Sequence, residues 1–455
     1  MSEHVRIKKG LDIPITGEAQ LYVAKRVTSG KMAFRTSDFR GLKARALVAE
    51  GDAVVTGQPL FEDIRKPQVR FCSPSCGRVT AVTADAGGLL SEVRMSSYES
   101  PEHVSFDIPK ISSLDRQQIL SLMLSGGLWP CIRQRPFNII ADPERMPNSI
   151  FISAFSSAPL APDNDFALAN SLEELQAGID VLGKLTRGGI HFCLPVKNFA
   201  GTDFHKLKGV IKHSVYGPHP AGNVGVQINR ISPINKGEVI WTVDLFHLAA
   251  IGRFFLTGAY NMRRLVAMTG PSAFNPSYVE CTYGMAMEDI ADHFDHWQGE
   301  LRIISGDVLS GANVGQKGFL RFYDGMVTII PEGEGREMFG WAKPLRFSKF
   351  SFSRLYFSHL LRDHMFEMDT KVNGSVRAFV LPSVYEKVFP MDIYPVELFK
   401  AIIARDIDRM EKLGIYEVTE EDVALCEYVC PSKIEIQSIL SDGISLMLEE
   451  EHCDE

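Results

Sequence analysis

Two cysteines near the C-terminus, Cys426 and Cys430, are the residues whose type and spacing first suggest chemistry. A four-iron cluster is held by four thiolates, most of them in one run of closely spaced cysteines that a proline follows. Here Pro431 follows Cys430, but the run contains only two of the four thiolates. The segment therefore resembles the remnant of a cluster motif, and we predict that it binds no cluster.

A second cysteine pair, Cys72 and Cys76, has the same spacing, so the two pairs together could form a four-thiolate zinc site. Nothing in the sequence brings the two pairs together. Free cysteine is also among the side chains most often buried in a core. Eight cysteines at irregular spacing are typical of reduced thiols rather than of a disulfide framework. We therefore predict buried, unreactive thiols and no metal site.

A loop with two glycines, residues 125–130, precedes a predicted strand and could cradle a phosphate or a flavin with its backbone N–H groups. It lacks the third glycine of a dinucleotide fingerprint, and no helix follows it directly. Aromatic and guanidinium groups gather in and after this loop, at Trp129, Arg133, Arg135 and Phe137. They could hold a planar carbonyl ligand by stacking and hydrogen bonds. The alternative is a structural aromatic cluster with solvent-facing arginines.

His219 stands in a loop rich in proline and glycine, residues 217–223, and is a candidate proton donor. A lone histidine in a turn is more often structural. The sequence contains no G-x-S-x-G elbow, no H-E-x-x-H metalloprotease motif and no Walker A loop. Standalone hydrolase or kinase chemistry is therefore not predicted.

Length, charge and hydropathy limit the fold that positions these residues. A chain of 455 residues exceeds a single hydrophobic core, so roughly three or four domains are expected. The net charge of −8 argues against nucleic acid as a partner, because phosphate binding needs a basic surface. Residues 1–10 contain no apolar stretch that could serve as a signal peptide, and the most apolar segment, Leu245 to Leu256, is too short to span a bilayer. A cytoplasmic chain without a transmembrane helix is expected.

Residues 41–94 alternate short apolar runs with Gly, Asp and Pro, which predicts a small sheet sandwich or barrel. This pattern resembles the biotinyl/lipoyl-type hybrid barrel. In carrier domains of that type a lysine at a hairpin tip bears the cofactor, and the nearest candidate here is Lys66. The residues that flank Lys66 differ from those of the carriers. A scaffold without a mobile cofactor arm is therefore favoured.

Residues 115–250 are predicted to alternate strands with helices, which favours an α/β layer with a largely parallel sheet. The expected strands are Phe137 to Ala141, Ile150 to Ala154, Ile190 to Pro195 and Gly225 to Ile228. Apolar residues at helical spacing predict a helix at Leu172 to Leu185, and Leu245 to Leu256 is expected to be another.

The C-terminal region is predicted to be mainly helical. Apolar residues at helical spacing run from Val396 to Leu413. Thr419 and Asp422 match a capping box, and Pro431 ends the helix that they start. That helix places the two C-terminal cysteines on one face. A packed helical bundle is the consequence.

A series of long sequence blocks, taken in order, resembles the A subunits of the Na+-translocating NADH:quinone oxidoreductases. The blocks are IKKGLDIPITG at 7–17, SGGLWPCIRQRPFNIIADP at 125–143, AFSSAPLAPD at 154–163, GPHPAGNVG at 217–225, VDLFHLAAIGRFFLTG at 243–258, ISGDVLSG at 304–311, NGSVRAFVLPSVYEKVFPMDIYP at 373–395 and EEDVALCEYVCPSK at 420–433. The resemblance therefore extends over essentially the whole chain.

The resemblance implies a multidomain fold of α/β and β parts. The expected domains are a biotinyl/lipoyl-like hybrid barrel at 1–105, a Rossmann-like α/β domain at 106–255 similar to the flavin subunit of respiratory complex I, a small β-grasp (SLBB-like) domain at 256–335 and a C-terminal helical bundle at 336–455. Relatives hold flavin in a GGAGFP-like loop, where this chain has the bulky Trp129. The resemblance thus implies that no flavin or cluster is tightly bound on this chain.

For function, the resemblance implies a peripheral subunit on the cytoplasmic side of the bacterial inner membrane, which works with five other subunits (B to F), several of them membrane-embedded. That complex oxidises NADH, passes electrons through flavins and iron–sulfur centres on other subunits to ubiquinone or menaquinone, and exports Na+. The isolated chain is not expected to be catalytic. In this family the A subunit is associated with quinone, and we predict the quinone site at Trp129, Arg133, Arg135 and Phe137, with His219 as a secondary candidate.

Other functions remain open at this point. The chain could be an autonomous flavin- or NADH-dependent reductase, a non-catalytic scaffold subunit, or a carrier modified at Lys66. A visible flavin spectrum of the purified chain would favour the first. An intact mass raised by a lipoyl or biotinyl group would favour the last.

Overall fold

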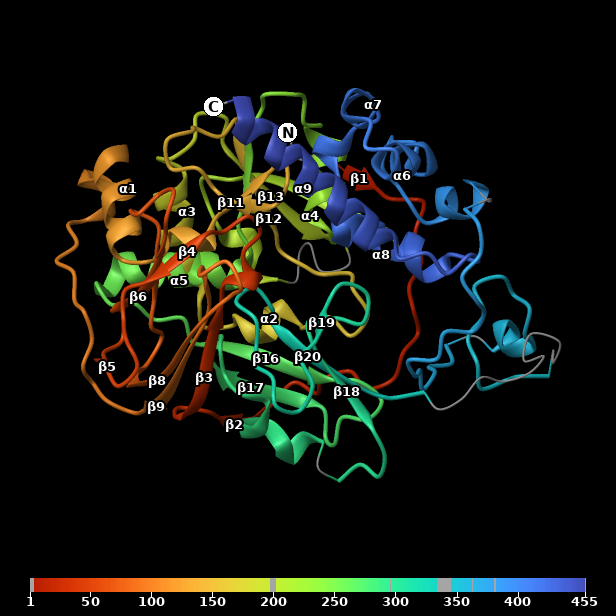
Figure 1. Ribbon diagram of the computed structural model, residues 1–455, viewed down its shortest axis with the longest axis horizontal. Coiled ribbons are helices and arrows are strands. Elements are labelled where there is room, and N and C mark those ends of the chain that lie inside the picture. The colour runs from red at the N-terminus through yellow and green to blue at the C-terminus, as the bar shows by residue number, and fades with distance from the viewer. Residues whose placement is uncertain are drawn as a thin grey trace.

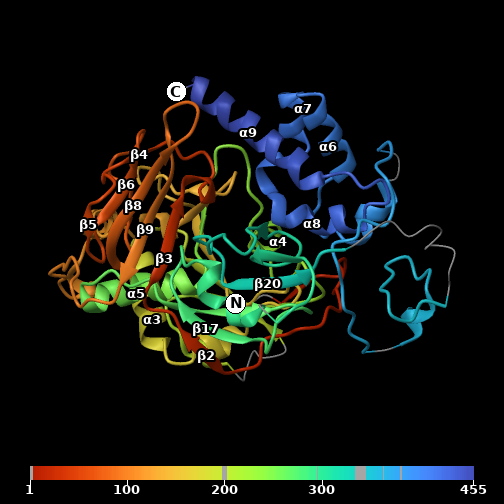
Figure 2. The same ribbon diagram turned by 60° about the horizontal axis from the view of Figure 1, so that its bottom comes forward.

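The computed structural model describes residues 4–196, 202–294, 296–333, 345–361, 363–379 and 382–454. Mixed sheets form most of the body, and the C-terminal helices α6 to α9 group together on one side of it (Figures 1 and 2). Among the described helices, none combines the length and the apolar character that crossing a lipid bilayer requires.

Two small antiparallel sheets form the N-terminal barrel. One has the strand order β3 (Gly30–Arg35), β9 (Leu90–Tyr98), β8 (Cys76–Ala84) and β5 (Ala53–Val54). The other has the order β4 (Ala44–Ala46), β6 (Pro59–Asp63) and β7 (Arg70–Cys72). Alternate side chains of β9, such as Val93 and Met95, point into the core because successive strand residues face opposite sides. The short strands expected between residues 41 and 94 are confirmed.

A seven-stranded sheet forms the α/β region. Its order is β1 (His4–Arg6), β14 (Ile211–Tyr216), β13 (Ile190–Pro195), β12 (Ser149–Ser153), β15 (Ile240–Thr242), β10 (Arg133–Arg135) and β11 (Ile139–Ile140). The strands are parallel from β1 to β15, and only β10 and β11 run antiparallel to their neighbours. The largely parallel sheet is thus as predicted.

Helices cover both faces of this sheet. Ile150 and Ile152 of β12 share a core with α3 (Leu172–Leu182) and α5 (Leu245–Thr257), whereas Phe151 packs against the opposite helix, α4 (Val224–Ile231). The remaining helices of the region are α1 (Arg116–Ser125) and α2 (Asn164–Ala167). The predicted helices at Leu172 and Leu245 are confirmed.

The strand predicted at Gly225 to Ile228 is wrong, because this segment belongs to helix α4. Over so short a run, its apolar residues fit both the repeat of a strand and the repeat of a helix. The contacts follow the helical spacing, since Val224, Ile228 and Ile231 all pack on the sheet. The strand predicted at Phe137 to Ala141 is shortened to β11, because the positive φ angles of Phe137 and Asn138 form the turn that precedes it.

After the barrel and the α/β region, the third region of the chain has a six-stranded sheet, called the third sheet below. Its order is β19 (Ala312–Asn313), β18 (Leu301–Ser305), β20 (Met326–Pro331), β16 (Arg264–Thr269), β17 (Ser277–Cys281) and β2 (Val23–Arg26). Its edge strand β2 comes from the N-terminal segment and pairs in parallel with β17. The first two strands of the chain therefore extend the α/β sheet and the third sheet, and neither belongs to the barrel.

The C-terminal helices are α6 (Pro395–Ile403), α7 (Ile407–Lys412), α8 (Glu420–Val429) and α9 (Ile436–Asp454). The helix predicted from Val396 to Leu413 is interrupted, since Arg405 has a positive φ angle between α6 and α7. The capping box at Thr419 and Asp422 is confirmed, with the Thr419 N–H donating to the Asp422 carboxylate at 3.0 Å. Apolar residues of all four helices share one core.

The two-glycine loop serves the contact between the barrel and the α/β region. Gly127 has a φ of +71°, and a Cβ atom there would lie 2.3 Å from the Cys72 sulfur of β7. Only glycine fits both the left-handed conformation and this close approach. The loop thus has a packing role that its glycines alone did not reveal.

We predict that Gly127→Ala lowers the free energy of unfolding by about 2 to 4 kcal/mol, through left-handed strain and the clash with Cys72. Gly88→Ala is the matched control, because Gly88 has a φ of +80° and a Cβ atom there would meet no other atom within 4 Å. The control should be destabilised only by the left-handed strain, which lowers its free energy of unfolding by about 1 to 2 kcal/mol. Denaturant titration of both variants checks this, and equal losses would contradict the packing role.

Candidate functional site

A narrow aromatic cavity lies between the barrel and the third sheet region. Its walls come from β3 and the turn after it, from β6 and β7, and from the segments next to β17 and β20. The lining residues are Phe34, Arg35, Asp38, Phe39, Leu60, Phe61, Phe71, Cys72, Tyr283 and Phe322. Most of this lining is aromatic, which is typical of sites for planar organic ligands.

Phe39 lies at the centre of the aromatic wall. Its ring centroid is 4.6 Å from that of Phe71, 5.0 Å from that of Phe322 and 5.8 Å from that of Tyr323. Phe61 and Phe71 stack nearly parallel at 4.5 Å. Such offset and edge-to-face contacts hold these rings together as one cluster.

Charged groups lie beside these rings. Asp38 accepts a hydrogen bond from the Phe322 N–H at 3.1 Å, and its carboxylate lies 3.6 Å from the Arg321 guanidinium. Burial raises the pKa of Asp38 to about 6, although Arg321 acts in the opposite direction. Arg35 pairs with Glu92 at 3.2 Å. The cavity thus combines aromatic faces with a carboxyl group that can be protonated near neutral pH.

The predicted site residue Arg133 does not line this cavity, but it contacts a tyrosine beside it. Its guanidinium carbon lies 4.6 Å from the centroid of the Tyr323 ring, a cation–π contact. Tyr323 in turn packs against Phe39 and donates its hydroxyl hydrogen to the Pro130 carbonyl at 2.8 Å. The block around residue 130 is therefore connected to the cavity through one tyrosine.

The predicted site residues Trp129 and Phe137 are both fully buried, in different cores. The Trp129 indole donates to the Ala141 carbonyl at 2.6 Å and packs edge-on against Trp241. Phe137 packs against Tyr416 near the C-terminal helices. The structure therefore does not gather the four predicted residues into one pocket.

Arg135 is buried and holds the first turn of α8. It donates to the Thr419 hydroxyl at 2.7 Å and to Glu421 at 2.5 Å, and it lies 3.5 Å from Asp422. Burial raises the pKa of Asp422 to about 6, against the effect of Arg135. A second arginine, Arg40, pairs with Glu420. Two arginines from different regions thus bind the same helix N-terminus.

His219, the secondary candidate, is buried at the junction of several segments. Its Nδ1 lies 3.0 Å from the Ser157 hydroxyl, and its backbone N–H donates to Asp12 at 2.8 Å. Burial lowers the pKa of His219, while the carboxylates of Asp307, Asp12 and Glu421 oppose this shift. The neutral imidazole therefore fits a structural hydrogen bond, and Glu421 is the group that His219 shares with Arg135.

The remaining sequence candidates are held in the fold. Lys66 lies in the turn between β6 and β7, and its amine is paired with Asp142 at 2.7 Å. Cys72 and Cys76 lie in the barrel, far along the chain from Cys426 and Cys430, which are buried among the C-terminal helices. Within the described residues, no three His, Cys, Asp or Glu side chains converge as a metal ion would require.

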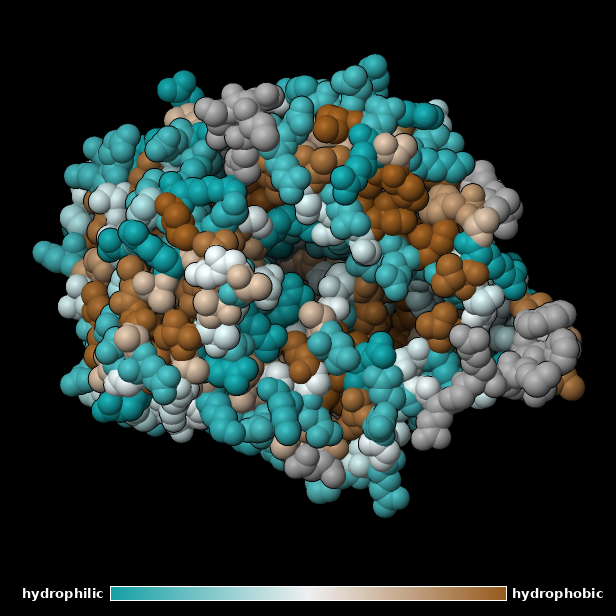
Figure 3. All heavy atoms as spheres, viewed as in Figure 1, coloured by the Kyte–Doolittle hydropathy of each residue, from teal (hydrophilic) through white to brown (hydrophobic). Residues whose placement is uncertain are grey.

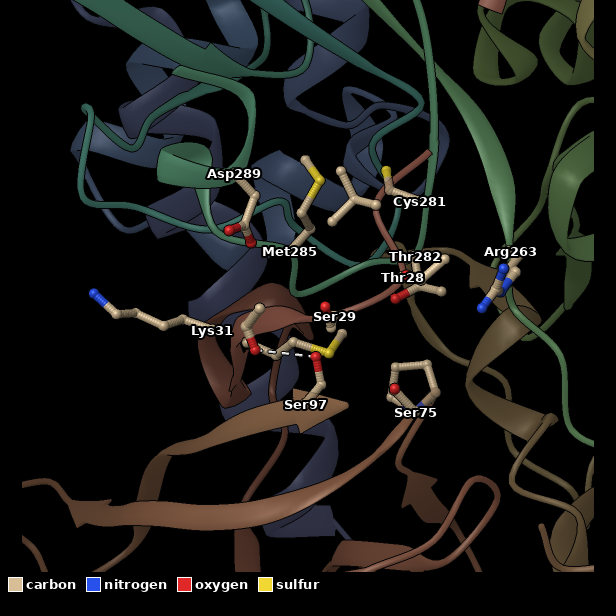
Figure 4. A pocket seen from close by; sticks show the side chains of 14 residues that line it. Thr28, Ser29, Lys31, Ser75, Ser97, Arg263, Cys281, Thr282, Met285 and Asp289 are labelled. Atoms are coloured by element: carbon tan, nitrogen blue, oxygen red, sulfur yellow. Dashed lines mark hydrogen bonds between the residues drawn. The ribbon is translucent and has the colours of Figure 1, made fainter. Parts of the chain in front are cut away.

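A second hollow, of about 350 Å³, lies between the barrel and η6 (Met287–His293) (Figure 4). The hydroxyls of Thr28, Ser29, Ser75, Ser97 and Thr282 line it together with charged groups, and no aromatic ring does. Ser97 donates to the Gly30 carbonyl at 3.0 Å across it. A planar apolar ligand fits the aromatic cavity better.

Sequence reasoning missed the segments that build the aromatic cavity. Phe34, Arg35, Asp38 and Phe39 stand within six residues, a density of aromatic and charged groups like that of the block after residue 128. That density was the available signal. The contribution of Phe322 was not readable, because it depends on contact across nearly three hundred residues of chain.

Comparison with known proteins matches three family models in succession. They are the NqrA N-terminal barrel-sandwich hybrid domain at residues 5–97, the NqrA second alpha/beta domain at 114–260 and the NQRA C-terminal domain at 265–316. The A subunit of the Na(+)-translocating NADH-quinone reductase of Rhodopirellula baltica is 36% identical over 97% of each chain. This chain belongs to that family.

Two further relatives of the same name support the assignment. Those of Vibrio alginolyticus and Serratia proteamaculans are both 34% identical over 98% of this chain and 100% of their own. The family assignment made from the sequence blocks is thus confirmed. The family models also confirm an N-terminal barrel-sandwich hybrid followed by an α/β domain.

We predict that Arg135→Leu costs about 3 to 5 kcal/mol of stability, because it leaves the buried Asp422 without its cation. Lys206→Met is the control, since Lys206 pairs with Asp203 at the surface and its removal should not shift the denaturation midpoint. Thermal and denaturant unfolding of both variants measures this. A midpoint of Arg135→Leu equal to that of the control would contradict the role of the buried charge cluster.

A second prediction concerns pH. The Asp38 carboxyl ionises at a higher pH in the folded chain than in the unfolded chain, so its ionisation removes stability as the pH rises from about 4 to about 6. Over that range, the free energy of unfolding of Asp38→Asn should therefore rise by about 3 kcal/mol relative to that of the wild type. Urea titrations at both pH values check this, and parallel pH profiles of the two proteins would rule it out.

Proposed function

We propose that this chain is the subunit of a Na+-translocating NADH:quinone reductase that binds the quinone ring, and that the ring enters the aromatic cavity. Family membership supports the first part, since the relatives are named as components of such a reductase. The cavity supports the second part. In this proposal the chain works within a complex at the membrane, and other subunits handle NADH, flavins, iron–sulfur centres and Na+.

The observation that carries the proposal is the aromatic lining of the cavity, with polar groups beside it. A quinone is a flat, apolar ring with two carbonyl oxygens that accept hydrogen bonds. Phe39 and Phe71 line the cavity, and the polar side chains of Asp38 and Arg35 lie beside them.

The chain's own residues then have distinct roles. Phe39 stacks on the ring, and a protonated Asp38 donates a hydrogen bond to one carbonyl oxygen. Arg133 orients Tyr323, which supports Phe39 from behind. Because the Trp129 indole and the two terminal nitrogens of Arg135 already bond within the protein, we assign these two residues, together with the buried Phe137, to positioning the wall. His219 is assigned no contact with the ring.

Binding of a short-chain ubiquinone to the purified full-length chain, measured by calorimetry, tests this assignment. Phe39→Ala should weaken the affinity by at least about tenfold, because it removes the central stacking face. Phe106→Ala is the matched control, since Phe106 packs against Phe254 and does not line the cavity. Equal affinities of the two variants would remove the cavity as the quinone site.

A further inference from the structure

The segment from residue 345 to 376, of which the structure describes 345–361 and 363–376, exposes many apolar side chains. It projects from the body beside the C-terminal helices in both ribbon views, and brown residues appear along that side of the surface (Figures 1, 2 and 3). Its exposed apolar residues are Leu345, Phe347, Leu355, Phe357, Leu360, Leu361, Met365, Val372 and Val376. Leu360 is 67% exposed and Val376 79%. So many exposed apolar residues in one segment mark an interaction surface.

Hydrogen bonds anchor the segment to the body at its base. The Phe366 N–H donates to the Pro14 carbonyl at 2.8 Å, and the Thr16 N–H donates to the Phe366 carbonyl at 3.1 Å. The Thr370 hydroxyl donates to Glu332, which is itself paired with Arg302. The exposed apolar residues stand on both sides of these anchors. The fold therefore holds the segment in place and leaves its apolar side chains uncovered.

The charge of the segment differs in sign from that of the whole chain. In the sequence from 345 to 376, five residues are Lys or Arg and three are Asp or Glu, a net charge of +2. The whole chain has a net charge of −8. An acidic surface is therefore the complementary partner for this part of the molecule.

The backbone of the segment distinguishes a protein partner from a lipid one. Its regular structure among the described residues is one 3-10 turn, η8 (Phe357–Leu360). An irregular backbone placed in hydrocarbon leaves N–H and C=O groups without partners, at high cost. A protein surface can pair these groups and cover the apolar side chains together.

We propose that residues 345–376 form the docking segment for another protein subunit, whose matching surface is apolar at its centre and acidic at its rim. The relatives are named as one subunit of a reductase, which supports a protein partner. Leu355 and Leu360 lie in the middle of the segment and insert into the apolar centre. Arg354 pairs with the acidic rim.

Co-purification with the remaining subunits tests the proposal. The full-length variant Leu355→Ser/Leu360→Ser, co-expressed with them, should be recovered in the detergent-solubilised complex at least about tenfold less than the wild type. The control is Leu21→Ser/Leu256→Ser, because Leu21 is 58% exposed and Leu256 47% on other surfaces. Equal recovery of the two variants, with unchanged unfolding midpoints, would overturn the docking role.

Two additional measurements separate the kinds of contact. Arg354→Glu should reduce recovery, and high salt should reduce recovery of the wild type. In flotation with vesicles of equimolar phosphatidylcholine and phosphatidylglycerol, the wild-type chain should remain unbound. Vesicle binding that the double serine variant abolishes would replace the protein partner with a lipid surface. The quinone affinity of the isolated chain should be unchanged in all these variants. A failure of the docking proposal can therefore be told apart from a failure of the proposed quinone site.

Discussion

The buried ion cluster at the N-terminus of α8 is the interaction on which the arrangement of the chain depends most. Arg135 is 1% exposed, and removing its charge from water is costly unless each donor finds an acceptor. Thr419, Glu421 and Asp422 supply acceptors for its two terminal nitrogens from one helical turn. The positive end of the helix dipole also favours the carboxylates there. These bonds hold the first turn of α8 against β10.

A short stretch of chain connects the ion cluster at α8 to the aromatic cavity. Arg40, which pairs with Glu420, directly follows Phe39, the central ring of the cavity wall. Arg133, two residues before Arg135 on β10, stacks on Tyr323 behind that ring. The position of the cavity wall is thus coupled to the docking of the C-terminal helices. The N-terminal strands β1 and β2 add to this by joining the α/β sheet and the third sheet.

The cysteines that first suggested a cluster have a different part in the structure. Cys426 and Cys430 are fully buried among apolar side chains, and burial raises the pKa of the Cys426 thiol. Cys430 lies 2.9 Å from the Tyr385 hydroxyl. Of the two glycines in the loop, Gly127 lies against Cys72 of the barrel and Gly126 against Phe254 of α5. Both segments therefore contribute contacts within the core.

The sequence by itself determined the family, the order of its regions and most of the regular elements. Strand alternation, helical spacing and the capping box at Thr419 are local patterns, so their signal survives in the order of residues. It failed at α4, where an apolar run too short to separate the two periods was read as a strand. It also could not show that Trp129 and Phe137 face different cores. The tertiary structure alone decided that, and it alone joined Phe39 with Phe322 and Arg135 with Asp422, because burial and pairing depend on residues hundreds of positions apart.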